Sequence, residues 1–498
     1  MRGFLASSIG VATAAALALP LALATPALAE SAAPAESAAY AESAAPVGPA
    51  GSTQSLPLVP LGPARDRATG APGMSATPRV PEAQGLPARE VKTFSLVGVV
   101  WDDAATELLG RVQVRTRSVA DGRWSDWQDV ETHNSEHAAD PDGAERTSGR
   151  VRGSTAPLWV GPSDGIEVRV RAGTGVRTLS SLPAGMRIEL VDPGEARPGT
   201  HDDKNGSTPA DGGADGDTQP GTDGGTDGGT GSGTGGDHKG RPGAAQGMTM
   251  AMAESSLANV PHAPLGATEI AELNKADATA DAVFASDGAL EAAARPYIGP
   301  RPKIITRRGW GADESLREAG FVYTQSVKAA FVHHTASGNN YACRDAPAVL
   351  RSLYRYHVVS SGWRDFGYNF AVDKCGNVYE GRAGGIAKPV LGAHTMGFNS
   401  NSMGIAVLGT FTASEPPQAA VDAVAGLTAW KLGLFNADPR GKTTLKSAGG
   451  NKFPKGRNVS MNVISGHRDG FATECPGKRL YGQLPPTRTA SAVLQGRP

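Results

Sequence analysis

The sequence has few cysteines, few aromatic residues and almost no net charge. Only 6% of its 498 residues are Phe, Trp or Tyr, whereas it contains 65 Gly and 36 Pro. Because large apolar side chains are scarce, one core that includes the whole chain is excluded, and we expect two folded domains separated by disordered segments. A formal net charge of -1 excludes a general attraction to nucleic acid or to anionic membrane surfaces.

Long hydrophobic runs are missing after the first thirty residues. At the start of the chain, Arg2 precedes a run of small apolar residues, Ile9–Ala24, and Ala27–Ala29 is typical of a cleavage site. The run is shorter than the roughly 20 apolar residues that a spanning helix needs, which favours secretion over a membrane anchor. We therefore expect a signal peptide at residues 1–29, a secreted protein that is extracellular or associated with the cell wall, and no stable membrane insertion.

The three cysteines are an odd number for a protein of an oxidising compartment, where thiols tend to pair. Cys343 precedes a predicted helix and Cys375 lies in a predicted hairpin turn, which is compatible with a disulfide between them. Cys475 then remains, and a bound metal would both protect its thiolate from oxidation and explain its presence.

Composition divides the first three fifths of the chain into segments. Residues 30–89 are rich in Ala, Pro, Ser and Gly and predict a disordered leader. Residues 90–192 contain Arg111–Arg117 and Ile166–Arg171, which alternate apolar and polar residues as half-buried strands do, and predict a small, sandwich-like all-β domain of unknown role. Residues 193–298 begin with Asp/Gly/Thr repeats that have no apolar face, and predict a linker.

Four tryptophans of the predicted β domain allow two interpretations. Exposed indoles could stack on sugar rings, but a Trp in a small β domain is more often a core residue, and we favour that interpretation. The residues are Trp101, Trp124, Trp127 and Trp159.

Residues 299–498 have the composition of a globular α/β domain. Ala329–His333 and Met403–Leu408 are short apolar runs that predict buried strands, and Gln418–Leu434 has helical periodicity. Residues 368–380 predict a hairpin with its turn near the second cysteine. Strands that alternate with helices predict a mixed sheet flanked by helices.

The C-terminal domain contains candidate zinc ligands. His333 and His334 lie where a predicted buried strand ends, and Cys475 follows His467 by eight positions. A catalytic zinc takes three protein ligands of this kind and keeps one position for water. Spacing alone leaves two alternatives open, a hydrogen-bonded core histidine and a disulfide-bonded cysteine.

Eight motifs resemble the peptidoglycan recognition protein family and the related phage amidases. They occur in the family's order and extend over residues 302–490. The motifs are Ile305–Arg307 with Trp310–Ala312, Phe331–Ala336, Gly367–Phe370, Tyr379–Arg382, Gly392–Thr395, Asn399–Gly404, Gly466–Asp469 and Thr473–Gly477.

The resemblance implies specific site residues. The family's zinc ligands correspond to His333, His467 and Cys475, so the implied cofactor is Zn2+, and its catalytic tyrosine corresponds to Tyr368. The phage enzymes have a lysine two positions before the cysteine ligand, but this chain has Thr473 there. Thr473 contributes either a hydrogen bond in catalysis or the shape of the loop.

The resemblance also implies the reaction, hydrolysis of the amide bond between N-acetylmuramic acid and L-alanine in peptidoglycan. We expect the protein to be a monomer. Zinc would polarise the carbonyl and lower the pKa of its bound water, while Tyr368 as a donor either stabilises the oxyanion or positions the water. The alternative is a non-catalytic peptidoglycan-binding protein. Such family members lack the cysteine ligand, so Cys475 favours the enzyme. A glycosidase would need a pair of flanking carboxylates, and no pair stands out.

Further residues are candidates for substrate binding. His394 resembles a residue that lines the substrate groove. Asn399 and Arg382 are candidates for contacts with the stem peptide, although turn formation and an ion pair explain them equally well. Trp363 belongs either to the groove or to the core. Glu380 is a possible proton carrier, but we expect it on the solvated surface.

Overall fold

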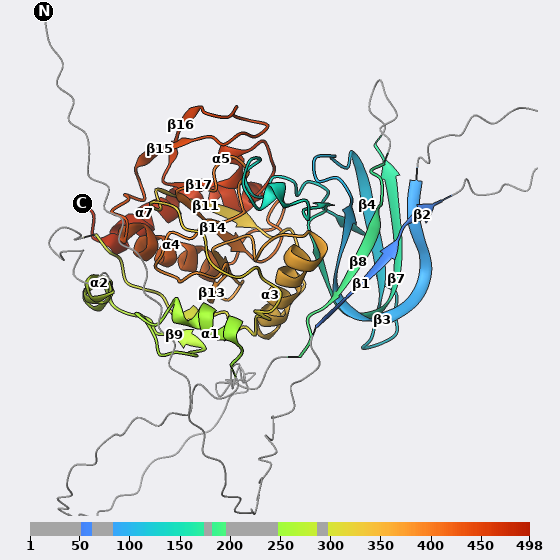
Figure 1. The fold of residues 1–498 in the computed structure, drawn as a ribbon, viewed down its shortest axis with the longest axis horizontal. Coiled ribbons are helices and arrows are strands. Elements are labelled where there is room, and N and C mark those ends of the chain that lie inside the picture. Colours follow the sequence, from blue (N-terminus) through green and yellow to red (C-terminus); the bar gives the residue numbers. More distant parts are fainter. Residues whose placement is uncertain (1–50, 62–82, 174–181, 196–247, 286–296) are drawn as a thin grey trace, which may run out of the picture. The chain divides into compact units, whose positions relative to one another are not determined.

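The computed structural model describes most of the chain downstream of residue 50 (Figure 1). The expected signal peptide, most of the expected leader and the Asp/Gly repeats lie outside the described residues. The described residues cluster as one compact unit. Within the described ranges, no helix combines the length and the hydropathy that crossing a membrane requires. The described residues are 51–61, 83–173, 182–195, 248–285 and 297–498.

The first folded part is an antiparallel sheet of eight strands, with the main path β1-β8-β3-β7-β4-β5. The two alternating segments of the sequence are strands, as predicted; they lie in β4 and β7, which pair antiparallel along their length. Their apolar residues, such as Val112 and Ile166, are fully buried in one core. The strands are β1 (Ser52–Pro57), β2 (Val59–Pro60), β3 (Ala83–Trp101), β4 (Gly110–Ser118), β5 (Gln128–Val130), β6 (Gly153–Ser154), β7 (Leu158–Ala172) and β8 (Arg187–Asp192).

The structure differs from the expected boundary between leader and β domain. Strands β1 and β2 lie inside the segment expected to be a disordered leader, residues 30–89, and β1 pairs antiparallel with β8. Composition does not reveal β1 because an edge strand is held by backbone hydrogen bonds and needs few apolar side chains; the residue that follows it, Leu58, is 8% exposed.

Of the four tryptophans that we expected to be core residues, only some are buried in the structure. Trp101 and Trp159 are buried core residues. Trp124 is 37% exposed, and Trp127 lies 3.9 Å from the Arg169 guanidinium, measured to the ring centroid. The core interpretation therefore holds for two of the four indoles.

The second folded part is a mixed sheet of seven strands in the order β17-β11-β14-β12-β13-β10-β9, which confirms the predicted α/β fold. β11 runs parallel to both β14 and β17, and β12 and β13 form the predicted hairpin. A separate hairpin pairs β15 with β16. The strands are β9 (Glu269–Ile270), β10 (Ile304–Ile305), β11 (Ala329–His334), β12 (Phe370–Val372), β13 (Val378–Glu380), β14 (Ser402–Val407), β15 (Lys442–Lys446), β16 (Asn458–Asn462) and β17 (Ile464–Gly466).

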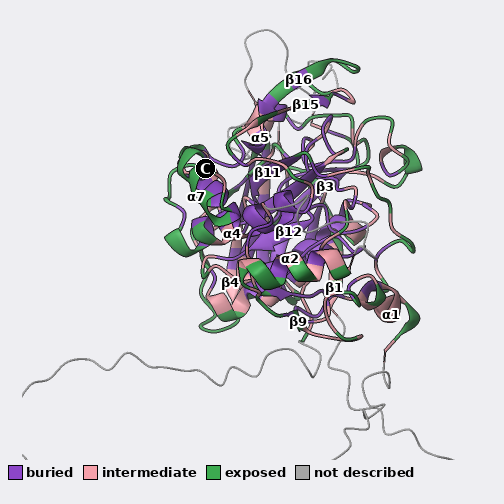
Figure 2. Cartoon of the chain, turned by 90° about the vertical axis from the view of Figure 1, so that its left-hand side faces the viewer, coloured by how far each residue is buried: buried purple, intermediate pink, exposed green. Residues whose placement is uncertain are grey.

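Helices α4 and α7 pack against each other beside this sheet, and α4 contacts β11 and β12 (Figure 1). Figure 2 shows that α4 and the central strands are buried, whereas α2 has an exposed face. The helices are α1 (Met250–Leu257), α2 (Lys275–Phe284), α3 (Ala346–Arg355), α4 (Gln418–Gly433), α5 (His467–Gly470), α6 (Lys478–Gly482) and α7 (Leu484–Gln495), with a π-helical turn at Tyr356–Ser360 after α3.

Part of the expected linker belongs to this second part. Within residues 193–298, strand β9 pairs with β10, and Ile270 and Ala278 are fully buried in the main core. The Ala-rich composition of this segment does not predict these contacts, because small apolar side chains are buried only where a neighbouring sheet packs against them.

The two parts share an apolar cluster. Leu96, Val100 and Val191 of the first sheet pack in one core with Leu353 and Tyr356. The Tyr356 hydroxyl donates a hydrogen bond to the backbone carbonyl of Thr155 at 3.0 Å. A Cβ on Gly98 would lie 2.4 Å from this hydroxyl, so the close approach requires a glycine there.

Candidate metal centre and the segment that covers it

Four buried side chains with metal-binding atoms converge at one end of the second sheet. They are His137, His333, His467 and Cys475, and their ligand atoms all lie within 4.8 Å of one another. The sequence predicts the last three. His137 was not predicted as part of the site, because it belongs to the first folded part.

Strand register brings the predicted histidines together. The parallel strands β11 and β17 align Val332 with Gly466. His333 follows Val332 directly, and His467 follows Gly466. The carboxyl ends of parallel strands meet at the same edge of a sheet, so both imidazoles leave the sheet side by side. Cys475 reaches them from the connection between α5 and α6.

The spacing of the donor atoms suits zinc. The ring centroids of His333 and His467 are 4.5 Å apart, and that of His137 lies 4.4 Å from His467 and 5.2 Å from His333. The Sγ atom of Cys475 is 3.8 Å from Nδ1 of His333. Bond lengths of about 2.3 Å to sulfur and about 2.05 Å to nitrogen at a tetrahedral angle place such donors about 3.6 Å apart.

The hydrogen bonding of the site also fits a metal ion. Within the described part of the chain, neither ring nitrogen of His467 has a hydrogen-bond partner, although both are buried. Buried polar atoms without a partner are rare and need an explanation. Cys475 is a free, buried cysteine, and a set of imidazole and thiolate donors is one that zinc prefers.

Electrostatics holds the imidazoles in the ligand form. Burial, reinforced by the neighbouring imidazoles, lowers the pKa of His333 and of His467 well below 6.5, so both are neutral. Burial raises the pKa of the Cys475 thiol well above 9. A thiolate at this position therefore requires a cation in contact with it.

Outer partners orient the His333 ring. The Thr395 hydroxyl is 3.3 Å from Nε2 of His333 and 3.0 Å from Nδ1 of His394, so Nδ1 of His333 remains directed at Cys475. Such contacts fix the ring plane of a metal ligand. His394, which the sequence places in the groove lining, is fully buried and acts here through Thr395.

The catalytic candidates lie beside the cluster. The Tyr368 hydroxyl is 3.0 Å from Nδ1 of His137, within hydrogen-bond distance, and burial raises the pKa of Tyr368 well above 10, so the phenol stays protonated. Thr473 Oγ1 accepts a hydrogen bond from the backbone N–H of Cys475 at 3.1 Å and donates one to Glu136 at 2.9 Å.

Residues 131–152 connect β5 to β6 and contact the metal centre and its surroundings; we call them the covering segment. Asp140 accepts a hydrogen bond from the Asn399 side chain at 2.8 Å. Glu145 binds the Arg382 guanidinium through two hydrogen bonds of 2.9 and 3.0 Å. The two residues proposed to contact a stem peptide are thus paired with carboxylates of this segment.

Little free space remains at the cluster. A cavity of about 30 Å³, which has room for water but not for a ligand, is lined by His137, Tyr368, Thr473 and Cys475. A second cavity of about 390 Å³ lies between the covering segment and residues that include Arg382. Only the second cavity is large enough for part of a ligand.

Two sequence candidates lie in the interior. Trp363 is buried and stacks on His357 with ring centroids 4.4 Å apart, so the structure places it in the core. Glu380 is 2% exposed, so the expectation of a solvated position was wrong. Its carboxylate accepts hydrogen bonds from the Asn259 side chain and from the backbone N–H of Arg307.

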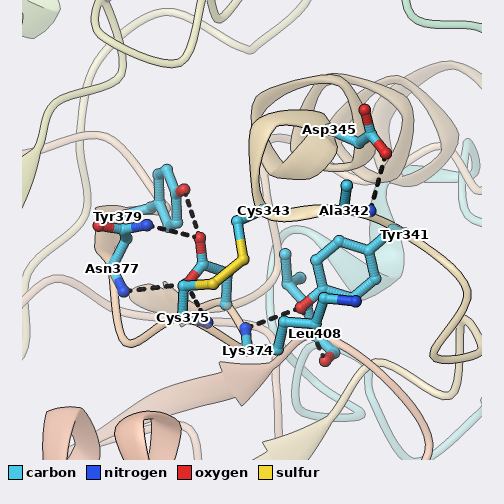
Figure 3. The surroundings of a disulfide bond; sticks show 10 residues. Tyr341, Ala342, Cys343, Asp345, Lys374, Cys375, Asn377, Tyr379 and Leu408 are labelled. Atoms are coloured by element: carbon cyan, nitrogen blue, oxygen red, sulfur yellow. Dashed lines mark hydrogen bonds between the residues drawn. A yellow bond between two sulfur atoms is a disulfide. The ribbon is translucent and has the colours of Figure 1, made fainter. Parts of the chain in front are cut away.

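The other two cysteines form a disulfide with a Cα–Cα distance of 6.1 Å (Figure 3). It links Cys343, just before α3, to Cys375 in the turn between β12 and β13. Asp373 fixes this turn by accepting hydrogen bonds from the backbone N–H groups of Cys375 and Asn377, both at 2.9 Å. Cys475 therefore remains free for a metal.

The sequence contains only a weak indication of the fourth donor. His133 and His137 lie four residues apart in a polar stretch with no strand or helix periodicity. Such a pair alone does not distinguish a metal ligand from a solvated loop. The partners of His137 are at least 196 residues away in the sequence, so only the folded chain reveals them.

Comparison with known families finds two matches. Residues 44–205 match the Rv3811 N-terminal galactose-binding domain-like family, and residues 323–478 match the N-acetylmuramoyl-L-alanine amidase family. The first match begins before β1, in agreement with the strands found there.

Individual relatives resemble the second part. Peptidoglycan-recognition protein SC2 of Drosophila melanogaster is 32% identical over 183 residues, which cover 36% of this chain and 84% of the relative. The human N-acetylmuramoyl-L-alanine amidase is 32% identical over 211 residues, 41% of this chain and 28% of that protein. The solved structure of wild-type Drosophila PGRP-LB has 27% identity and a TM-score of 0.29, and covers 36% of this chain and 91% of that one.

Proposed function

Because the chain belongs to the family of peptidoglycan recognition proteins and N-acetylmuramoyl-L-alanine amidases, we propose that it hydrolyses the amide bond between N-acetylmuramic acid and L-alanine in peptidoglycan. The supporting observation is the convergence of His333, His467 and the free Cys475, with two unpartnered imidazole nitrogens among them. Imidazole and thiolate are donors that zinc prefers, and three protein ligands are the number that a catalytic zinc site uses.

The chain's own residues have separate roles in this reaction. His333, His467 and Cys475 would hold the zinc ion, which would supply Lewis acidity and the activation of a water molecule. His333 and His467 bind as neutral imidazoles, and Thr395 fixes the plane of the first ring. Tyr368, which remains protonated, donates a hydrogen bond to the oxyanion that develops on the substrate carbonyl.

The substrate would lie along the region that contains Arg382 and Asn399. Both side chains are donors, and both are positioned by carboxylates of the covering segment. Guanidinium and amide groups of this kind suit the carboxylates and carbonyls of a peptide. The disulfide of Cys343 with Cys375 agrees with secretion, because such bonds persist in oxidising compartments.

Digestion of purified peptidoglycan by the zinc-loaded full chain tests the proposal. Mass spectrometry should detect stem peptides with a new L-alanine amino terminus, and both a chelator and Cys475→Ala should abolish their release. Glu474→Ala is a matched control, because this neighbouring side chain is 80% exposed. Release that persists in Cys475→Ala would refute the metal mechanism, and an intact wall that still binds the chain would indicate a recognition protein without chemistry.

A further inference from the structure

We propose that His137 is a fourth ligand of the zinc site and that the covering segment occupies the substrate groove, so that the folded chain is a latent enzyme. The proposal rests on the amidase function proposed above. It assigns a role to the first folded part, which supplies both the ligand and the segment.

Coordination is the first observation. A structural zinc site is closed by four protein ligands, whereas a catalytic site keeps one position open for water or substrate. His137 places a fourth donor among the other three, within 4.8 Å of each. Its Nδ1 lies 3.0 Å from the Tyr368 hydroxyl. In the tautomer with the proton on Nδ1, this nitrogen donates to the phenol oxygen and Nε2 presents its lone pair to the metal. With His137 bound, no corner remains for the nucleophilic water.

Burial of the covering segment is the second observation. Glu136, His137 and Ala138 are 3%, 6% and 3% exposed, although connecting segments ordinarily run over the surface. Their polar groups are bonded to the second folded part: the Glu136 carbonyl accepts from the backbone N–H of Met396 at 2.9 Å. The segment is therefore inserted between the first sheet and the metal centre.

Competition with substrate is the third observation. The covering segment engages the residues assigned to the reaction and to the stem peptide, through His137 to Tyr368, Asp140 to Asn399 and Glu145 to Arg382. A cavity of about 30 Å³ at the cluster does not admit an amide with its flanking groups. Substrate therefore enters only when the segment moves away.

Cobalt substitution tests the fourth ligand without an activity measurement. Azide added to the Co2+-loaded full chain should leave its visible absorption unchanged, because no position is open. Azide should shift the absorption of Co2+-loaded His137→Ala. His133→Ala is the matched control in the same segment, since His133 is exposed, and it should behave as the wild type. An equal azide response in wild type and His137→Ala would overturn the proposal.

Release of stem peptides from purified peptidoglycan tests latency. His137→Ala should release them roughly tenfold faster than the wild type or more, because activity scales with the open fraction. Glu145→Gln weakens the segment's attachment without touching the four donors, and should give a smaller increase at one bound zinc per chain. This second variant decides the question if His137→Ala does not fold; no increase in Glu145→Gln would then refute latency.

The two proposals fail in different ways. If His137→Ala alone binds azide but no variant releases stem peptides, the fourth ligand stands and the amidase function is wrong. If wild type and His137→Ala both bind azide and release stem peptides at the same rate, the amidase function stands and latency is wrong.

Discussion

Replacing Glu380 by glutamine is expected to change how stability depends on pH. The carboxylate accepts hydrogen bonds from the Asn259 side chain at 2.8 Å and from the backbone N–H of Arg307 at 3.2 Å. Burial outweighs these bonds and raises the pKa of Glu380 from 4.5 to about 7. A buried carboxyl with a raised pKa is held more stably as the neutral acid than as the carboxylate.

The sign follows from proton binding. The folded state binds the Glu380 proton more tightly than the unfolded state does, so stability falls as pH rises from about 4.5 to about 7 and stays low above that. With these two pKa values the loss is about 0.8 kcal/mol at pH 5 and about 3.4 kcal/mol at pH 8. Glutamine has no such loss, so its stability relative to wild type should rise by about 2.5 kcal/mol between the two pH values.

Urea unfolding of the full chain at pH 5 and pH 8 measures this difference. The Trp310 indole donates a hydrogen bond to the Glu380 backbone carbonyl at 2.7 Å, so its fluorescence reports on this region. The glutamine amide faces the Arg307 N–H as a second donor, which costs about 1 kcal/mol at both pH values and cancels in the comparison. Glu474→Gln, with an exposed side chain, is the control. A stability difference that is the same at pH 5 and pH 8 would refute the reasoning.

Three further predictions concern the metal centre and the disulfide. Cys475→Ala should reduce bound zinc, measured by elemental analysis, from one per chain to almost none. It should also lower the thermal midpoint, because zinc at about a thousandfold excess over its dissociation constant stabilises the fold by about 4 kcal/mol. Full zinc content in the variant would contradict the ligand assignment. Tyr368→Phe should lower kcat roughly 100-fold to 1,000-fold at unchanged zinc content, and an unchanged kcat would remove Tyr368 from the reaction. Joint replacement of Cys343 and Cys375 by serine opens a loop with a sequence separation of 32 and should lower the free energy of unfolding by about 3 to 4 kcal/mol in urea titrations. A loss smaller than about 1 kcal/mol would show that the disulfide does not stabilise the fold by lowering the conformational entropy of the unfolded chain.

Short local sequence patterns predicted one part of the metal site. His333 ends an apolar run that forms β11, and His467 and Cys475 lie in short motifs shared with the amidase family. Strand periodicity and the hairpin of β12 and β13 were likewise predicted and are confirmed. These features depend on a few consecutive residues, so their patterns survive in the sequence.

Features that depend on distant neighbours were not predicted. Glu380 was expected on the solvated surface, where carboxylates usually lie. In the fold, β13 lies between β12 and β10 with both faces covered, and the carboxylate is buried. The position of His137 was likewise not predicted, because its partners at the metal centre lie far from it in the sequence.

The contacts between the two folded parts are of two kinds, and the difference indicates which part moves in activation. Leu96 and Val191 meet Leu353 in an apolar cluster that excludes water, so separating the sheets would expose a core. The covering segment is held mainly by hydrogen bonds and ion pairs, such as Glu145 with Arg382. Each of these can be exchanged for a bond to a peptide carboxylate or carbonyl at small net cost. Opening of the metal centre is therefore expected to move the segment while the sheets stay packed, and peptidoglycan itself has the groups to replace it.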